Sequence, residues 1–387
     1  MAIATEPAQK PANKPACPHF SSGPTAKRPG WDISNLNLDV LGRSHRSALG
    51  KERLKLAIDL TREVLEVPEN YRIGIVPASD TGAVEMAMWS LLGPRGVDVA
   101  AWESFGSGWI TDAQTQLPLD DLNILKGEYG HLPDFSNYDG TRDLVFTWNG
   151  TTSGVKIPNA DFIPTDRDAL TICDATSAAF AQPLDWDKLD VITFSWQKVM
   201  GSEAGHGMLI LSPRAVERLE SYNPPWPLPK LFRMKKGGKI NEGIFQGATI
   251  NTPSMLAVED YIDSLTWAKS IGGLPTLLQR ADENAKVIWD WVEKTPWIKN
   301  LAVNKAEWSN TGVCLVFDDN RIKDNAAFSK AFVNLLAQEN VALDFGSYRD
   351  APAGLRIWCG SAVEKSNLET LTPWLDWAFE TLIQKEG

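Results

Sequence analysis

Two residues with complementary chemistry follow two predicted strands near the middle of the chain. Asp174 comes directly after the apolar run Leu170–Cys173. Lys198 closes the segment Ser195-Trp196-Gln197-Lys198, which follows the apolar run Val191–Phe194. A lysine amine can form a Schiff base with pyridoxal phosphate (PLP), and a carboxylate can keep the pyridine nitrogen protonated so that the ring accepts electrons. On their own, the two residues are equally compatible with a surface lysine and an aspartate that caps a turn.

Three other predicted strand ends carry residues that suit a PLP site. The segment Val76-Pro77-Ala78-Ser79-Asp80-Thr81-Gly82 predicts a strand, a turn of small residues and a helix start, where backbone N–H groups and the helix dipole favour a phosphate. Trp102 ends another strand and could stack on the pyridine ring. The polar loop Asn149–Gly154 could bring a hydroxyl to the ring oxygen. A capped helix, a core tryptophan and a plain turn are the ordinary alternatives.

The elements that must position these residues alternate along residues 72–212. Short, continuously apolar runs indicate strands buried on both faces of a largely parallel sheet. Helices are expected over Ala83–Leu92, with Ser79 and Asp80 as cap candidates, and over Arg214–Ser221 after Pro213. The pattern is that of an α/β fold, in which ligands bind at the carboxyl ends of the strands. The seven expected strands are Arg72–Pro77, Val97–Trp102, Leu122–Leu125, Asp143–Trp148, Leu170–Cys173, Val191–Phe194 and Met208–Ser212.

Residues 222–253 interrupt this alternation. The proline-rich stretch Asn223–Pro229 excludes a helix or a central strand. A helix is expected after Asn251-Thr252-Pro253, with Thr252 as its cap and Pro253 in its first position, and it should run to Lys269. Between these features lies a basic run consisting of Lys230, Arg233, Lys235, Lys236 and Lys239.

The last third of the chain predicts a second, smaller α/β domain. A helical stretch covers Leu274–Glu293, and an amphipathic helix near Leu368–Gln384 closes the chain. Between them, short strands are expected over Gly312–Phe317, Val341–Phe345 and Leu355–Trp358. We therefore expect an N-terminal arm over residues 1–16 that is flexible or loosely docked, a large domain over 17–265 and a small domain over 266–387.

Composition narrows the class of protein further. The chain has 387 residues, 43% of them hydrophobic, and a net charge of −11, so a broad basic surface for nucleic acid is not expected. Its four cysteines are scattered without a C-x-x-C pair, which predicts neither a metal site nor a disulfide framework and favours the cytoplasm. Neither a signal peptide nor an apolar run long enough to span a membrane is expected.

In this order, the motifs resemble those of the fold-type I PLP enzymes, specifically the class V aminotransferases, and among these the phosphoserine aminotransferases. The resemblance spans roughly residues 17–360 and implies a mostly parallel seven-stranded sheet in the large domain. The segments that carry it are Phe20-Ser21-Ser22-Gly23-Pro24-Thr25, Gly42-Arg43-Ser44-His45-Arg46-Ser47, Ser195-Trp196-Gln197-Lys198, Asn251-Thr252-Pro253 and Gly354-Leu355-Arg356.

The resemblance also implies a role for each site residue and a homodimer that shares its active sites. Lys198 would carry the cofactor and Asp174 would pair with its pyridine nitrogen, while Arg356 would bind the substrate α-carboxylate. The remaining implied cofactor contacts are Trp102 on the ring, Thr151 on the ring oxygen, and Ala78, Ser79 and Gln197 on the phosphate, with Asn251 and Thr252 from the partner subunit. His45 and Arg46, also from the neighbouring subunit, would meet the distal anion of the substrate.

The implied reaction moves the amino group of L-glutamate to 3-phosphohydroxypyruvate and gives O-phospho-L-serine and 2-oxoglutarate, as in serine biosynthesis and, by extension, pyridoxine biosynthesis. The turn Ala78-Ser79 lacks the arginine that the better-known branch of the family carries there, so the basic run 230–239 is the candidate that compensates. Three alternatives stay open. An aminotransferase of the alanine/serine–glyoxylate type has no substrate phosphate to bind, a cysteine desulfurase needs a reactive cysteine, and a non-catalytic PLP-fold protein needs no carboxylate-binding arginine.

Overall fold

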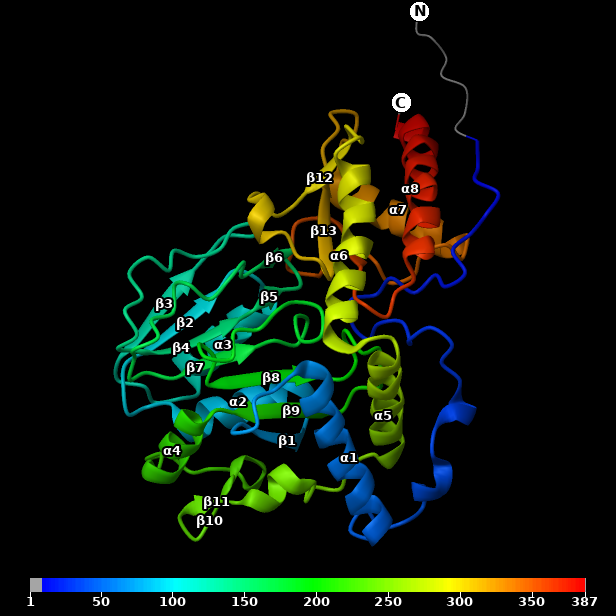
Figure 1. Cartoon of the computed structure of the whole chain (residues 1–387). Coiled ribbons are helices and arrows are strands. Elements are labelled where there is room, and N and C mark those ends of the chain that lie inside the picture. Colours follow the sequence, from blue (N-terminus) through cyan, green and yellow to red (C-terminus); the bar gives the residue numbers. More distant parts are fainter. Residues whose placement is uncertain (1–8, 387) are drawn as a thin grey trace, which may run out of the picture.

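The computed structural model describes residues 9–386, which form two main sheets and two short hairpins with helices around them (Figure 1). The larger sheet has seven strands in the order β1-β9-β8-β7-β4-β2-β3. Its strands are β1 (Arg72–Pro77), β2 (Val97–Ala101), β3 (Leu122–Lys126), β4 (Asp143–Thr147), β7 (Thr171–Asp174), β8 (Val191–Ser195) and β9 (His206–Leu211). All seven expected strands are confirmed, with ends that shift by at most two residues.

The sheet is mostly parallel, as expected. β2, β3, β4, β7 and β8 pair in parallel, whereas β9 runs antiparallel to both of its neighbours, β1 and β8. The connection between β8 and β9 carries Lys198. A short hairpin of β5 (Asn149–Gly150) and β6 (Val155–Lys156) follows β4. The carboxyl ends of β4, β7 and β8 therefore lie side by side.

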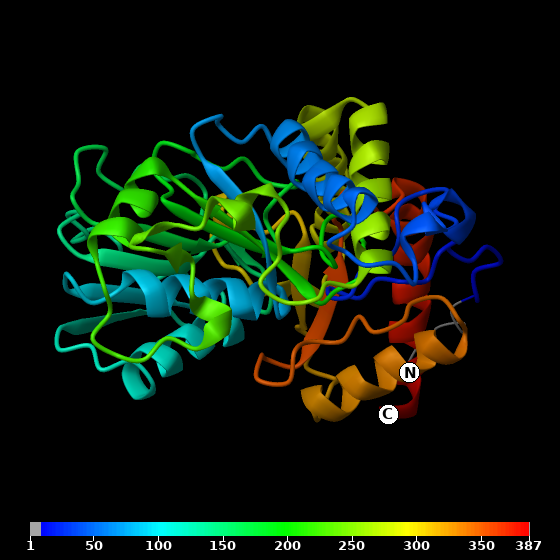
Figure 2. The same cartoon turned by 90° about the horizontal axis from the view of Figure 1, so that it is seen from below.

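The strands are continuously apolar because both faces of the sheet are covered. On β4, Val145 joins the core shared with α2 (Ser79–Leu91), α3 (Ser104–Thr115) and α4 (Pro213–Ser221). Its neighbours Leu144 and Phe146 face the other core, which includes α1 (Ala48–Leu65) and α5 (Met255–Ser270). Figure 2 shows the same arrangement seen from below. The two-sided burial explains why no polar alternation appears in these strands.

The smaller sheet is antiparallel and is built from the last third of the chain. It consists of β12 (Ile298–Asn300), β13 (Gly312–Phe317) and β14 (Gly354–Trp358), accompanied by α6 (Gly273–Val292), α7 (Asn325–Gln338) and α8 (Lys365–Glu386). Stacked aromatic rings contribute to its core, with the centroids of Trp297 and Phe379 4.1 Å apart. β12 and α7 were not expected from the sequence.

Three local expectations are wrong. Val341–Phe345 is not a strand, because Asp344 has a φ of 53° that breaks the extended run and leaves only an isolated bridge between Leu343 and His19. Ser254, not Thr252, caps α5, and its hydroxyl accepts a hydrogen bond from the Ala257 N–H at 3.3 Å. The N-cap of α2 is Ala78, so Ser79 and Asp80 are its first helical residues.

The domain boundaries remain a prediction. The proposed division between residues 265 and 266 falls inside α5, about one turn before its end at Ser270. Residues 1–8 of the expected arm lie outside the described residues. Residues 9–16 contact the last third of the chain, where Lys10 forms an ion pair with Glu339 after α7 at 2.7 Å and Trp374 of α8 donates a hydrogen bond to the Asn13 carbonyl at 2.7 Å. Among the described residues, no helix is both long and apolar enough to cross a bilayer.

Candidate active site

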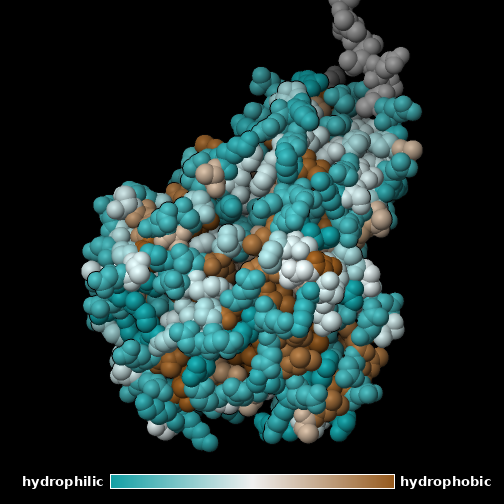
Figure 3. All heavy atoms as spheres, viewed as in Figure 1, coloured by the Kyte–Doolittle hydropathy of each residue, from teal (hydrophilic) through white to brown (hydrophobic). Residues whose placement is uncertain are grey.

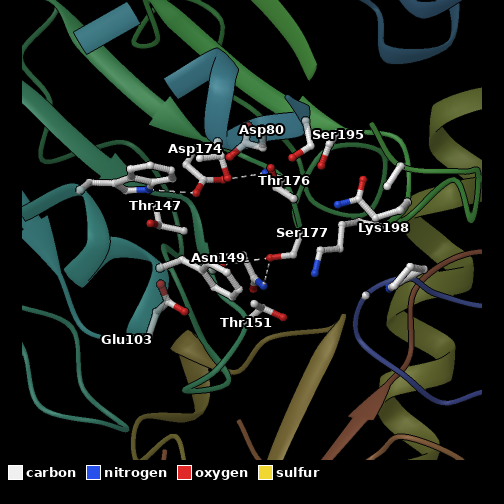
Figure 4. Close-up of a pocket in the computed structure, with 18 residues that line it drawn as sticks. Asp80, Glu103, Thr147, Asn149, Thr151, Asp174, Thr176, Ser177, Ser195 and Lys198 are labelled. Atoms are coloured by element: carbon white, nitrogen blue, oxygen red, sulfur yellow. Dashed lines mark hydrogen bonds between the residues drawn. The ribbon is translucent and has the colours of Figure 1, made fainter. Parts of the chain in front are cut away.

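A cavity of about 280 Å³ opens at the carboxyl ends of β4, β7 and β8, beside the first turn of α2 (Figure 4). It is lined mainly by small polar residues and by two aromatic rings. Of the residues expected at the site, it collects five, which are Ser79, Thr151, Asp174, Gln197 and Lys198. They come from four separate segments of the sequence, so the fold of the sheet brings them together.

Lys198 is buried and its amine faces the cavity. Its Nζ donates a hydrogen bond to the Ser22 carbonyl at 2.5 Å, and Thr25 holds the backbone on either side of it, with its N–H bonded to the Gln197 carbonyl at 3.0 Å. Burial lowers the pKa of Lys198 to about 8, and the positive charge of Arg356 adds to this effect. About a tenth of the amine is therefore unprotonated at pH 7, far more than for an ordinary lysine, and this is the form that attacks a carbonyl carbon.

Asp174 lies across the cavity from Lys198, at the end of β7 (Figure 4). One carboxylate oxygen accepts a hydrogen bond from the Thr176 N–H at 3.0 Å. The other oxygen accepts one from the indole Nε1 of Trp109 at 3.2 Å. Because donors hold both oxygens, the carboxylate is fixed in orientation at the wall of the cavity.

Two further acids line the cavity that the sequence analysis did not single out as site residues. Glu103 caps α3, accepts hydrogen bonds from the Gly106 N–H and the Thr152 hydroxyl, and burial raises its pKa to about 7. Asp80 stands in the first turn of α2 beside Asp174 (Figure 4). Glu103 could have been identified as a site residue from its place directly after Trp102 at a strand end. Asp80 was considered only as a helix cap.

Several buried polar atoms around the cavity have no hydrogen-bond partner in the described chain. They are Oγ1 of Thr147, Thr151 and Thr176, Oγ of Ser195 and Oε1 of Gln197. Buried polar atoms are normally paired, so this group indicates a polar ligand.

At one end of the cavity, Ala78 and Ser79 have φ of 66° and 54°, a conformation that non-glycine residues rarely adopt and that is often found at functional sites. The residues present fit PLP, because the cavity offers an amine, a fixed carboxylate, unpartnered hydroxyls and a helix N-terminus without a side-chain cap.

Trp102 does not line the cavity as the stacking prediction requires. Its indole is buried in the core, donates a hydrogen bond to the Val155 carbonyl at 3.0 Å and packs edge-on against Phe135. Phe105 and Trp109, which both belong to α3, line the cavity instead. The Lys198 amine lies 5.9 Å from the centre of the Phe105 ring. A strand-end tryptophan could not be told from a core tryptophan without the turn that follows it.

Arg356 and Ala78 border the site without lining the cavity. Arg356 lies on β14, with its guanidinium 5.4 Å from the centre of the Tyr348 ring and its buried Nε without a partner. Its positive charge is one of the causes that lower the pKa of Lys198. Ala78 lies one residue before the lining residue Ser79. The smaller sheet therefore contributes a free guanidinium edge to a site built on the larger sheet.

The residues expected from the partner subunit lie outside the cavity. His45 and Arg46 precede α1, where His45 is half-buried and Arg46 is exposed. Asn251 and Thr252 form an exposed turn before α5. The expected role of these four residues across a dimer stays a prediction.

The basic run 230–239 does not supply a phosphate-binding cation to this cavity. Its residues form a turn and a two-stranded hairpin, β10 (Lys235–Lys236) and β11 (Lys239–Ile240), beside α4. Lys239 pairs with Glu220 at 2.8 Å, and Lys235 donates to the Tyr222 carbonyl and to Asn223. Within one chain, the missing arginine at Ala78-Ser79 is not replaced by this run.

The cysteines do not support a desulfurase. Cys314 is buried on β13 and Cys359 is buried directly after β14, as the apolar context of both predicted. Burial raises the pKa of the Cys314 thiol to about 12 and raises that of Cys359 further. Neither thiol is a ready nucleophile.

The fold and site agree with the family to which the sequence belongs. Residues 132–357, more than half of the chain, match the family described as Aminotransferase class-V, and the chain belongs to this family. It is 57% identical over 371 residues to a phosphoserine aminotransferase of Methanosarcina mazei, which covers 96% of this chain and 99% of that protein.

Solved structures show the same fold at lower identity. A phosphoserine aminotransferase from Cytophaga hutchinsonii superposes with a TM-score of 0.79 at 20% identity, over 92% of this chain and 97% of the other. An alanine–glyoxylate aminotransferase from Nostoc sp. gives 0.77 at 18% identity, over 97% and 98% of the two chains. Because the two scores are so close, the fold alone does not distinguish the substrates.

Proposed function

We propose that this chain is a PLP-dependent phosphoserine aminotransferase that transfers the amino group of L-glutamate to 3-phosphohydroxypyruvate, giving O-phospho-L-serine and 2-oxoglutarate. The observation that carries the reaction class is the buried amine of Lys198 opposite the fixed carboxylate of Asp174. The substrate rests on the name of the relative that is 57% identical over nearly the whole length of both chains.

The cavity residues divide the work of holding PLP. Lys198 would hold it covalently through Nζ, Asp174 would accept a hydrogen bond from its pyridine nitrogen, and Thr151 would donate to its ring oxygen. Phe105 and Trp109 supply apolar surface to the ring in place of Trp102. When bound, PLP supplies an electron sink that stabilises negative charge at the substrate Cα.

Proton movement falls to Lys198. Its pKa of about 8 lets the amine take up the proton of the substrate Cα and return it near neutral pH. The carboxylate of Asp174 stays in place throughout, because its two hydrogen bonds fix it to α3 and to the turn after β7. Arg356 presents the unpartnered edge of its guanidinium to the substrate α-carboxylate, a planar pairing that a lysine could not make.

The phosphate of the cofactor is assigned to the first turn of α2, with Ala78, Ser79 and Gln197. The N–H groups at a helix start carry partial positive charge, and Ala78 has no side chain to cap them. Asn251 and Thr252 of a second copy of the chain would complete this cradle, and His45 and Arg46 of that copy would meet the substrate phosphate.

A homodimer is therefore part of the proposal. Hydrophobic residues gather on the lower part of the face in Figure 3, the region that α1 and α5 occupy in Figure 1. The exposed hydrophobic residues before α1 and on α5 are Ile33, Leu38, Leu41 and Leu256. Exposed apolar side chains near the segments that must reach a partner site favour a second copy as their cover. We assign the enzyme to the cytoplasm and to serine biosynthesis, with pyridoxine biosynthesis as a second use.

The second candidate is an aminotransferase that uses glyoxylate, because the Nostoc enzyme of that kind shares the fold with a TM-score of 0.77 and the fold does not separate the two substrates. A panel of keto acids with glutamate as donor distinguishes the two. Phosphohydroxypyruvate should be used with a kcat/KM at least about tenfold above that for glyoxylate or pyruvate. Preference for glyoxylate would reject the proposed substrate, and absence of turnover with every acceptor would favour a non-catalytic protein.

A further inference from the structure

Asp80 is a buried acid that lies beside a second carboxyl group. It belongs to the first turn of α2, it lines the cavity, and its side chain is 7% exposed. Its neighbours are the carboxylate of Asp174 and the hydroxyls of Thr176 and Thr193. Figure 4 shows Asp80 and Asp174 beside each other on the same wall of the cavity. The two carboxyl groups therefore meet with no cation between them.

Two carboxylates in contact in a buried site cannot both be ionised, so they share a proton. Both oxygens of Asp174 already accept hydrogen bonds, one from the Thr176 N–H and one from Trp109, so this carboxyl group is held as an acceptor. Asp80 accepts fewer hydrogen bonds than Asp174, since its buried Oδ1 has no hydrogen-bond partner in the described chain. The proton consequently belongs on Asp80.

We propose that Asp80 is a protonated carboxylic acid that donates a hydrogen bond to Asp174 and holds that carboxylate in position. Asp80 is thus a positioning residue, with Asp174 as the group that contacts the cofactor. The identity of what Asp174 binds rests on the proposed function, whereas the protonation of Asp80 does not.

The pKa values of Asp80 and of the groups around it agree with a proton on Asp80. Burial, followed by the negative charge of Asp174, raises the pKa of Asp80 well above its usual range. The other titratable groups that interact with Asp80 are Cys173 on β7, whose pKa burial also raises, and Lys198 after β8. Of Asp174, Cys173 and Lys198, Lys198 is the one that can be a cation, and its own pKa is lowered.

A neutral Asp80 also resolves a conflict at the helix start. The first turn of α2 attracts anions through its N–H groups, and an ionised Asp80 in the same turn would repel a phosphate there. Protonation leaves the positive end of α2 available, which matters because Ala78 and Ser79 bring no cationic side chain of their own. Asp80 can therefore support Asp174 without weakening the phosphate end of the cavity.

The first test uses the protein without cofactor. The variants are Asp80→Asn, which keeps a donor but cannot ionise, and Asp80→Ala, with Glu85→Gln on the same helix as a control outside the cavity. Infrared spectra at about pH 7.5 should contain a protonated carboxyl band that Asp80→Asn removes and Glu85→Gln leaves in place. If the Asp80→Asn spectrum lacked only carboxylate absorbance relative to the wild-type spectrum, Asp80 would be ionised and the proposal would be overturned.

The pH dependence of unfolding gives an independent measurement. Since the folded-state pKa of Asp80 is raised above its unfolded value of about 3.9, the folded state binds the extra proton, and stability falls as pH rises between the two values. Asp80→Asn should abolish this contribution. The difference between the Tm of the variant and the Tm of the wild type should therefore increase in favour of the variant as the pH rises from about 5 to 7.5. Parallel curves for the two proteins would contradict a protonated Asp80.

The positioning role is tested with PLP added. Asp80→Ala should raise the Kd for PLP by about ten- to a hundredfold, and Asp80→Asn should restore most of the loss because its amide also donates. Equal losses in both variants would mean that the donor is irrelevant. If PLP failed to bind even the wild type, the proposed function would fail, while the infrared and unfolding results would still decide the state of Asp80.

Discussion

Gly23 approaches the amine of Lys198 so closely that a Cβ on residue 23 would stand 2.2 Å from Nζ and 2.9 Å from Cε. The preceding residue, Ser22, accepts the hydrogen bond of the same amine. The N-terminal segment is therefore one wall of the site, although 175 positions separate Gly23 from Lys198 in the sequence (198 − 23). Because Gly23 has no side chain, the Lys198 amine has room at this point of the wall.

Gly23→Ala is accordingly expected to displace the amine and to lower transamination by about tenfold or more, because small misplacements at a catalytic group cost large factors in rate. Gly108→Ala is the matched control, since nothing lies within 4 Å of a Cβ at that helical position. The control should be slightly stabilised, by about 0.5–1 kcal/mol. Steady-state rates and Tm values of both variants test this, and a Gly23→Ala enzyme with wild-type rates would show that the amine moves freely.

The pKa of Lys198, about 8, predicts how PLP binds to the protein without cofactor. Only the neutral amine reacts, so the rate constant of binding should rise with pH and level off above about pH 8. Arg356→Gln removes a nearby positive charge, which favours the protonated amine and raises its pKa. The plateau should then begin at higher pH. Stopped-flow absorbance across the pH range measures both curves, and an unchanged midpoint in the variant would place Arg356 too far away to act.

Asp174→Asn should bind PLP but lose about a hundredfold or more in rate, since a neutral amide cannot hold the pyridine nitrogen protonated. Trp109→Phe removes one donor to the same carboxylate and keeps a ring in the cavity. Its loss should be smaller, about tenfold. Single-turnover rates with saturating PLP compare the variants. Near-normal turnover of Asp174→Asn would exclude Asp174 as the pyridine partner.

The larger sheet was predictable because its strands are buried on both faces and therefore read as continuous apolar runs, as in Val191–Ser195. The direction of β9 was not predictable, since the same apolar run serves a parallel or an antiparallel neighbour. Val341–Phe345 failed for a local reason: one residue, Asp344, adopts a left-handed conformation inside an apolar run. Such a conformation is set by tertiary contacts that composition does not record.

The pair Asp174 and Lys198 was predictable from its place at strand ends, whereas most of the lining residues that helices supply were missed. Asp174 is the last residue of β7 and Lys198 comes three residues after the end of β8, so the edge of the sheet collects them. Phe105, Trp109 and Asp80 enter the cavity from the first two turns of α2 and α3, and their directions depend on where each helix begins. The chemistry of the pair was thus visible in the sequence, whereas the aromatic wall and the second acid were not.

Arg46→Ala should raise the KM for phosphohydroxypyruvate by about ten- to a hundredfold with a much smaller change in the glutamate half-reaction, because a charge-assisted contact to a phosphate is lost. Arg95→Ala is the control, as Arg95 pairs with Asp168 away from the cavity. KM values for an unphosphorylated analogue complete the comparison. Equal losses for both keto acids would show that Arg46 does not contact the phosphate, and would favour the glyoxylate alternative.

The central claim is that the buried amine of Lys198 carries the cofactor and moves the proton. Lys198→Ala removes the amine and leaves the strand that precedes it, so the fold should be retained by circular dichroism. We predict that this variant, mixed with PLP, shows neither the visible absorbance of the covalently held cofactor nor transamination from glutamate to phosphohydroxypyruvate. Turnover at even a tenth of the wild-type rate, or unchanged absorbance, would contradict the assignment.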